Sequence, residues 1–319
     1  MRYFGAILFM LIAGFWEAGA QISPLADQYL VNGFLTNPAL AGTSRYAPLF
    51  LSARLDWLGM EGAPKYQTLT YHKTILDKRQ RFNPRGFLNR GDNSFGKVGI
   101  GGGAFNLTTG AISQAGIHLD YAYHVYLDKG RLSFGLAPMY HQFIIDKSRL
   151  IPPGGTSDPV LENTGKEVLH FVDVNAGIHY FSKNFFAGAS VVQLFNSSVW
   201  FGDLSFTSTE DNWNNSWLNR NFYTYAGLSF ELGKSLLLEP SALLKYSEQK
   251  GIGIQANTLI TISDNYQMGL FWRYRQAIGF FAGIRTGNLV FRYQFESPIG
   301  SKVPVQFVSN QVLVGYLLE

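Results

Sequence analysis

Three side chains able to do acid–base chemistry fall on one face of a strongly alternating stretch. His118, Asp120 and His124 occupy even positions, and the odd positions between them are apolar. With Ser113 or Ser133 they could form a metal site or a hydrolase triad. In an extended chain His118 and His124 lie about 20 Å apart at ~3.3 Å per residue, so they cannot share a metal ion. We therefore expect them to line a wet interior, and predict no catalytic residue, no metal and no cofactor.

A glycine-rich run lies shortly before them. The stretch Gly99-Ile100-Gly101-Gly102-Gly103 superficially resembles a phosphate-binding loop, but no lysine-serine pair follows and its flanks have strand character. Gly99, Gly101 and Gly103 share one face of that strand, where the missing side chains leave space. We expect a plug or the N-terminal segment to pack there.

The elements that position these groups are long strands. Segments of apolar/polar alternation, several of them ten to fifteen residues long, recur from about residue 45 to the end. Soluble strands have a mode of about five to six residues, whereas a tilted membrane strand needs ~9–11. The pattern predicts an all-β transmembrane antiparallel β-barrel of about fourteen strands. The expected strands are 45–57, 65–76, 95–107, 113–127, 131–146, 168–182, 184–195, 221–233, 235–246, 251–262, 265–275, 277–286, 287–297 and 306–318.

Arginines set which strand face meets lipid. Arg273, Arg275 and Arg292 alternate with large apolar residues in two of the C-terminal segments. An arginine on the lipid face would cost about 2–4 kcal/mol at the bilayer midplane. We therefore expect these three side chains to face the lumen or the rim.

The first twenty residues have the pattern of a signal peptide. Arg2 precedes an apolar core from Phe4 to Phe15, and Ala18-Gly19-Ala20 is a small-residue cleavage site before Gln21. The expected organisation is a signal peptide at 1–20, removed between Ala20 and Gln21, and one outer-membrane β-barrel at 21–319. Within it, 21–44 is a short N-terminal segment packed in or beneath the barrel, with a short helix near 26–31, and 45–319 is the barrel.

Composition narrows the function classes. The absence of cysteine excludes thiol catalysis, thiolate metal sites and disulfides. A net charge of +4 is too small to indicate nucleic-acid binding. Aromatic residues make up 15% of the chain, which suits the aromatic girdles of a membrane barrel. The longer connections are 77–94, which is basic, 147–167, 196–220 and 298–305. Strand parity alone leaves open which of them face outside.

The first part of the mature chain resembles the opening of the PorP/SprF family, and the resemblance continues along most of the chain. The matching elements occur in the family's order and spacing, and are Gln28-Tyr29, Asn37-Pro38-Ala39, Ala41-Gly42, Trp57-Leu58-Gly59, Gly62-Ala63-Pro64, Gln67-Thr68 and His72. The C-terminal end departs from the family's usual pattern, with Arg292-Tyr293-Gln294 and Ser309-Asn310-Gln311. These departures bear on partner identity more than on fold.

This resemblance implies a non-enzymatic component of type IX secretion in the outer membrane of a Gram-negative bacterium. Such a protein helps to secrete or anchor a partner that carries a type IX C-terminal domain, for example a gliding adhesin, or contacts periplasmic components of the system. Outer-membrane lipid is a further expected partner, and nucleic acid is not. The family-motif residues expected to have a structural or docking role are Asn37, Pro38, Gly42, Trp57, Gly59, Gly62 and Pro64.

Three alternatives stay open at this point. The motif residues could simply shape the first turn, because proline fixes φ and glycine permits unusual φ. The protein could be an outer-membrane transport channel for small or hydrophobic ligands, which needs a continuous lumen. A lipid-modifying barrel enzyme would need a serine or aspartate next to His118 or His124 on a neighbouring strand.

Overall fold

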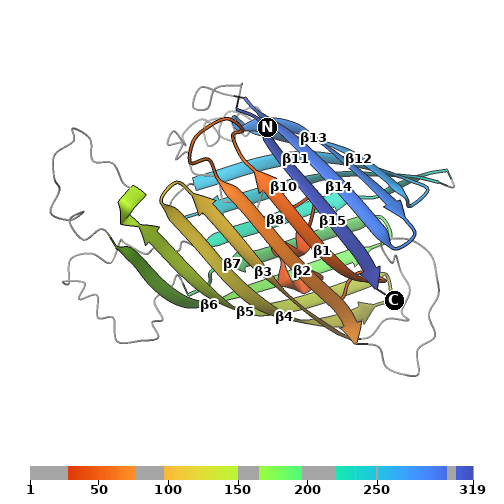
Figure 1. The fold of residues 1–319 in the computed structure, drawn as a ribbon. Helices are drawn as coiled ribbons and strands as arrows, with labels where there is room; N and C mark the ends of the chain where they lie inside the picture. Colours follow the sequence, from red (N-terminus) through yellow and green to blue (C-terminus); the bar gives the residue numbers. More distant parts are fainter. Residues whose placement is uncertain are drawn as a thin grey trace, which may run out of the picture.

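The computed structural model describes residues 28–75, 97–149, 165–195, 220–233, 235–248, 251–299 and 307–318. Its strands form one antiparallel sheet in which each strand pairs with its sequence neighbours, and β1 (Ala47–Leu55) pairs with β15 (Ser309–Leu318). The sheet therefore closes into the barrel seen in Figure 1. Among the described residues, no helix is long and apolar enough to span a membrane. The proposed signal peptide and its cleavage site lie outside the described residues.

All fourteen predicted strands are present, which confirms the predicted fold. The strands between β1 and β15 are β2 (Lys65–Ile75), β3 (Val98–Thr109), β4 (Ile112–Leu127), β5 (Gly130–Asp146), β6 (Lys166–Ser182), β7 (Phe185–Val192), β8 (Asn221–Leu228), β9 (Phe230–Leu232), β10 (Leu236–Ser247), β11 (Gly251–Ile262), β12 (Tyr266–Arg273), β13 (Ala277–Thr286) and β14 (Leu289–Pro298).

The strands β8 and β9 are one strand of the barrel, interrupted at Ser229. Both pair with β10, and their register is continuous across the break, from Ser241↔Gly227 to Leu238↔Phe230. Continuing that register places Pro240 of β10 opposite the end of β8. Proline has no backbone N–H, so the ladder loses a hydrogen bond at this position without changing direction.

Alternation along each strand separates a lipid face from a lumen. In β4, Ile117 and Leu119 are 56% and 68% exposed, whereas His118 and Asp120 are buried. An apolar outer surface around a polar interior is typical of a membrane barrel. Arg273 is buried in the lumen and Arg275 is exposed in the turn after β12, as predicted.

The strand directions divide the connections between two ends. One end, here called the terminal end, holds the start of β1 and the end of β15. It also holds the short turns after β4, β6, β9, β11 and β13, and the connection 76–97. The opposite end holds the connection 56–64, the short turns after β3, β10 and β12, the connection between β14 and β15, and the long connections 147–165 and 193–220. The topology thus shows which connections share an end of the barrel.

Candidate functional site

The described part of the N-terminal segment, residues 28–43, lies inside the barrel and is called the plug below (Figure 1). It crosses the lumen and touches several walls. The Tyr29 ring lies 5.1 Å from that of Tyr225 on β8, and Val31 packs with residues of β1, β13, β14 and β15. The side chain of Asn32 donates a hydrogen bond to Thr70 Oγ1 on β2 at 2.8 Å. The packed N-terminal segment predicted from the sequence is therefore present.

The helix expected near 26–31 falls partly outside the described residues, which begin at Gln28. Gln28 has 3-10 conformation and residues 29–31 form a turn, closed by the Asn32 amide donating to the Gln28 carbonyl at 2.7 Å. Two short 3-10 helices follow, η2 (Gly33–Leu35) and η3 (Pro38–Leu40). Burial raises the pKa of Tyr29 well above its ordinary value, so its phenol stays neutral.

Asn37 organises the centre of the plug. It is the N-cap of η3, where its Oδ1 accepts the Ala39 amide at 2.9 Å, and Pro38 follows at the first helical position. Its Nδ2 donates to the carbonyl of Ile178 on β6 at 3.0 Å and to the Tyr225 hydroxyl at 3.1 Å. Asn37 is fully buried, so all these bonds are made away from bulk water. One side chain therefore both starts the helix and fixes it to the wall.

A row of small lumen-facing residues contacts the part of the plug around Asn37 and Gly42. Each residue of the row pairs with the next across six neighbouring strands, β2 to β7. The row consists of Thr74, Gly99, Ala122, Gly135, Gly177 and Ser190. Because paired residues in adjacent strands lie side by side, the row forms a continuous furrow across the wall. We call it the glycine seat.

The seat leaves no room for side chains at its glycines. A Cβ on Gly135 would lie 2.2 Å from the Ala39 nitrogen, and one on Gly177 would lie 2.1 Å from Asn37 Oδ1. A Cβ on Gly99 would lie 2.1 Å from the Ala41 carbonyl oxygen. These contacts confirm the predicted packing of the N-terminal segment against the glycine-rich run.

Hydroxyl groups at both ends of the seat hold the motif along its length. Ser190 Oγ donates to the Thr36 carbonyl at 2.6 Å, and Thr74 Oγ1 donates to the Gly42 carbonyl. The Gly42 amide donates to His72 Nδ1 at 3.2 Å. Gly42 has φ +66°, a conformation that favours glycine. The seat therefore fixes the plug at its two ends as well as at Asn37.

The remaining motif residues lie elsewhere. Trp57, Gly59, Gly62 and Pro64 belong to the connection between β1 and β2 at the opposite end, about 30 Å along β1 at ~3.3 Å per residue. There the Gly110 amide donates to the Gly62 carbonyl at 2.9 Å, and the Asp56 amide donates to the Pro64 carbonyl at 2.9 Å. Both Gly59 and Gly62 have positive φ. The motif is contiguous in sequence but serves two separate places.

The acid–base side chains form two separate pairs. His118 Nδ1 lies 2.6 Å from Asp120 Oδ2, and His124 Nδ1 lies 2.8 Å from Ser133 Oγ. Within the described residues, no hydrogen bond joins one pair to the other, and none links Ser113 to either. In that part of the chain, no group of three His, Asp or Glu side chains is placed to hold a metal ion. The geometry gives no chain from serine through histidine to carboxylate.

The sequence reading missed an ion network near the opposite end of the lumen. Glu296 on β14 accepts two hydrogen bonds from Arg273 on β12, at 2.6 and 3.0 Å, and one from Arg54 on β1 at 2.9 Å. All three side chains are buried. The sequence indicates only that the two arginines lie on lumen-facing positions. It does not indicate their partner, because Glu296 comes close to both only through the pairing of five strands. The network ties the closing strands of the barrel together.

Comparison with known proteins identifies a family. The chain matches the family described as "Type IX secretion system membrane protein PorP/SprF" over residues 18–314. No curated protein matches the chain in sequence. The barrel, its apolar outer surface and this match support an outer-membrane location.

Solved outer-membrane barrels resemble the structure at low identity. Omp33 of Acinetobacter baumannii is 6% identical with a TM-score of 0.45, covering 87% of this chain and 100% of Omp33. A Pseudomonas aeruginosa FadL homologue is 10% identical with a TM-score of 0.47, covering 95% and 96%. The P. putida toluene transporter TodX is 10% identical with a TM-score of 0.44, covering 89% and 92%.

Proposed function

Because this chain belongs to the PorP/SprF family of type IX secretion system membrane proteins, we propose that it is a non-enzymatic component of that system. It helps to secrete, or anchors at the cell surface, a partner that carries a type IX C-terminal domain, such as a gliding adhesin. In addition or instead, it links to the periplasmic machinery. The chain is exported with a signal peptide that is cleaved between Ala20 and Gln21.

The seated plug is the observation that carries this proposal. An open channel needs a continuous lumen, whereas here Asn37, Thr36 and Gly42 fix a segment across the interior. The glycine seat packs tightly against that segment, since a Cβ at Gly99, Gly135 or Gly177 would overlap it. A barrel with a fixed internal segment suits a binding or anchoring role.

The loop lengths orient this role in the membrane. In bacterial outer-membrane barrels, short turns face the periplasm and longer loops face outside. The terminal end holds five short turns and one long connection, and the opposite end holds two long connections, so by this rule the terminal end faces the periplasm and the connections 147–165 and 193–220 face the exterior. The basic connection expected at 77–94 then joins β2 to β3 on the periplasmic side.

Deletion of the gene and complementation test the proposal. We expect the deletion strain to lose one or more proteins with a type IX C-terminal domain from the surface and medium, with their unprocessed forms retained in the cell. The wild-type gene restores them, and quantitative proteomics of both fractions provides the readout. Unchanged surface and medium fractions in the deletion strain would contradict the proposal.

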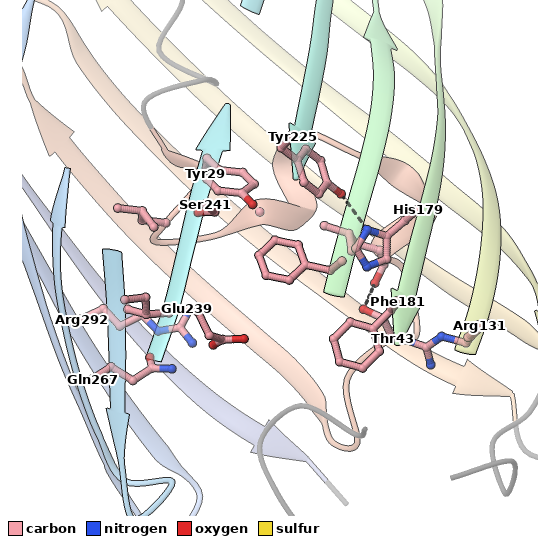
Figure 2. A pocket seen from close by; sticks show the side chains of 15 residues that line it. Tyr29, Thr43, Arg131, His179, Phe181, Tyr225, Glu239, Ser241, Gln267 and Arg292 are labelled. Carbon is pink, nitrogen blue, oxygen red and sulfur yellow. Dashed lines mark hydrogen bonds between the residues drawn. The ribbon is translucent and has the colours of Figure 1, made fainter. Parts of the chain in front are cut away.

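One observation favours a transport channel as a second candidate. A mostly apolar cavity of about 220 Å³ lies in the lumen beside the plug, and Tyr29 of the plug and Phe181 of β6 are among the residues that line it (Figure 2). A transporter with this plug would have to release it during transport. Single-channel recording in planar bilayers separates the two functions, because the anchoring role predicts no steady conductance and a passive pore predicts a stable one.

A further inference from the structure

The cavity beside the plug has one apolar wall from the plug and another from the barrel. Tyr29, Leu30 and Leu40 line it from the plug, and Phe186 on β7 and Leu259 on β11 line it from the barrel (Figure 2). Its volume of about 220 Å³ lies below the ~300–1,000 Å³ typical of small-molecule pockets. A space of this size and lining suits one large apolar side chain.

The cavity lies at the terminal end of the barrel. Arg131 is the second residue of β5, Phe181 is the penultimate residue of β6, and Gln267 is the second residue of β12. The plug separates it from a second, smaller cavity of about 20 Å³, which Tyr66 and Val192 line toward the opposite end. A ligand that enters the cavity from the periplasmic side therefore reaches the plug, which closes the inner end of the cavity. A cavity closed at one end suits a bound ligand better than a solute that crosses the barrel.

Among the residues that the structure describes, no acidic group compensates the positive charge of Arg131 at one corner of the cavity. Arg131 is 7% exposed, its Nε has no hydrogen-bond partner, and it makes no ion pair with any described residue. Its hydrogen-bond partner is the neutral phenol of Tyr126, and the imidazoles of His124 and His179 are its other charged or titratable neighbours. A buried guanidinium without a counter-charge is costly, so an anion bound here gains a strong interaction.

His179, which lines the same cavity as Arg131, keeps a ring nitrogen that such an anion could use. His179 uses Nδ1 on the Tyr225 hydroxyl at 3.0 Å, and its Nε2 has no hydrogen-bond partner among the described residues. The carboxylate that lines the cavity, Glu239, accepts a hydrogen bond from Ser229 Oγ at 2.9 Å. Figure 2 shows Glu239 on the far wall from Arg131. The cavity thus combines an apolar interior with a cationic corner.

We propose that this cavity receives the end of an extended peptide, with a large apolar C-terminal side chain in the cavity and the chain's carboxylate on Arg131. Capture of a C-terminal carboxylate is a recurrent mode of peptide recognition. The inference rests on the proposed function in so far as the peptide belongs to the secreted partner. Arg131 and His179 bind the carboxylate, while Phe186, Leu259 and Leu40 contact the side chain.

Binding of defined peptides to the purified full-length protein in lipid nanodiscs tests this inference. The probes are a fluorescent hexapeptide ending in phenylalanine with a free carboxylate, the same peptide as an amide, and one ending in glycine. We expect the free acid to bind about tenfold or more tightly than either of the others, because it alone makes both contacts. Equal binding of acid and amide would overturn the proposal.

Substitutions assign the effect to this corner of the cavity. Arg131→Gln is expected to reduce binding of the acid to that of the amide, and Arg131→Lys to retain a preference for the acid. The matched control Arg149→Gln removes one positive charge from an exposed residue at the opposite end of the barrel and leaves binding unchanged. Heat-dependent gel mobility confirms that each variant folds. A free-acid preference that persists in Arg131→Gln would overturn the assignment.

Two further readouts separate this proposal from others. Dodecanoate that binds in an Arg131-dependent way, when none of the peptides binds, would assign the cavity to a fatty acid and overturn the peptide proposal. Co-purification of a type IX partner from native outer membrane is measured in parallel. A partner that co-purifies while no peptide binds would refute the cavity's role alone. Peptide binding without any co-purifying partner would refute the proposed function instead.

Discussion

A single methyl group at the centre of the glycine seat should unseat the plug. In Gly135→Ala the new Cβ would lie 2.2 Å from the Ala39 nitrogen and 2.4 Å from the Pro38 carbonyl carbon. Both are backbone atoms, which cannot turn aside as a flexible side chain would. Overpacking of this kind costs about 1–3 kcal/mol. The fraction of molecules with a released plug should therefore rise about 5- to 150-fold.

The absence of cysteine makes this release measurable. Leu35 is a buried plug residue, and Leu35→Cys introduces a smaller side chain as the only thiol. Its reaction with a water-soluble maleimide reports the released population, so the labelling rate should rise by the same 5- to 150-fold in Gly135→Ala. The barrel itself should stay folded, as judged by heat-dependent gel mobility.

A second glycine gives the matched control. Gly253 lies on the same lumen-facing side of β11 as Gln255, and its Cβ would have only Lys245 Cβ within 4 Å, at 3.9 Å. Gly253→Ala should leave the labelling rate at Leu35→Cys unchanged. Equal labelling rates in Gly135→Ala and Gly253→Ala would refute the argument that the seat holds the plug by steric fit.

Four other substitutions, with one control, test separate contacts. Asn37→Ala removes a helix cap and two hydrogen bonds to the barrel wall, and we expect it to destabilise the seated plug by about 3 kcal/mol. The loss is measured as faster maleimide labelling at Leu35→Cys, and an unchanged labelling rate would show that Asn37 does not hold the plug. Thr74→Val and Ser190→Ala should each cost about 0.5–1.5 kcal/mol in the same assay and should add, because they act at opposite ends of the seat. Glu296→Ala removes the carboxylate that pairs with Arg273 and one of the two that pair with Arg54, which keeps Asp56 at 2.7 Å, and it should destabilise the barrel by about 3–5 kcal/mol in heat-dependent gel mobility. Glu248→Ala, which breaks an exposed pair with Arg220, should cost about 0–1 kcal/mol, and a similar loss in both variants would contradict the role of burial.

The strands were predictable because each carries its own signal. Alternation with a period of two, and the cost of arginine in lipid, set the faces of β4 and β12 without knowledge of their neighbours. The break between β8 and β9 was not predicted, because it depends on Pro240 and the sequence does not show which residue Pro240 pairs with. The fold therefore follows from local pattern and one environmental constraint.

The glycine seat was only partly predictable. The run at Gly99 and Gly101 indicated free space on one strand, but Gly135 and Gly177 became neighbours of Gly99 only through the register of four strands. In the same way, the motif elements at Asn37 and Gly62 are near in sequence but lie at separate places because β1 runs between them. Long-range register, not residue type, decides which small residues form one furrow.

Affinity purification of the tagged protein from native outer membrane, followed by quantitative mass spectrometry, tests the central claim most directly. We predict that a secreted protein with a type IX C-terminal domain, or periplasmic components of that system, co-purifies in near-stoichiometric amount. Recovery of the protein alone, in a form that conducts ions in a planar bilayer, would contradict the account and establish a transport channel instead.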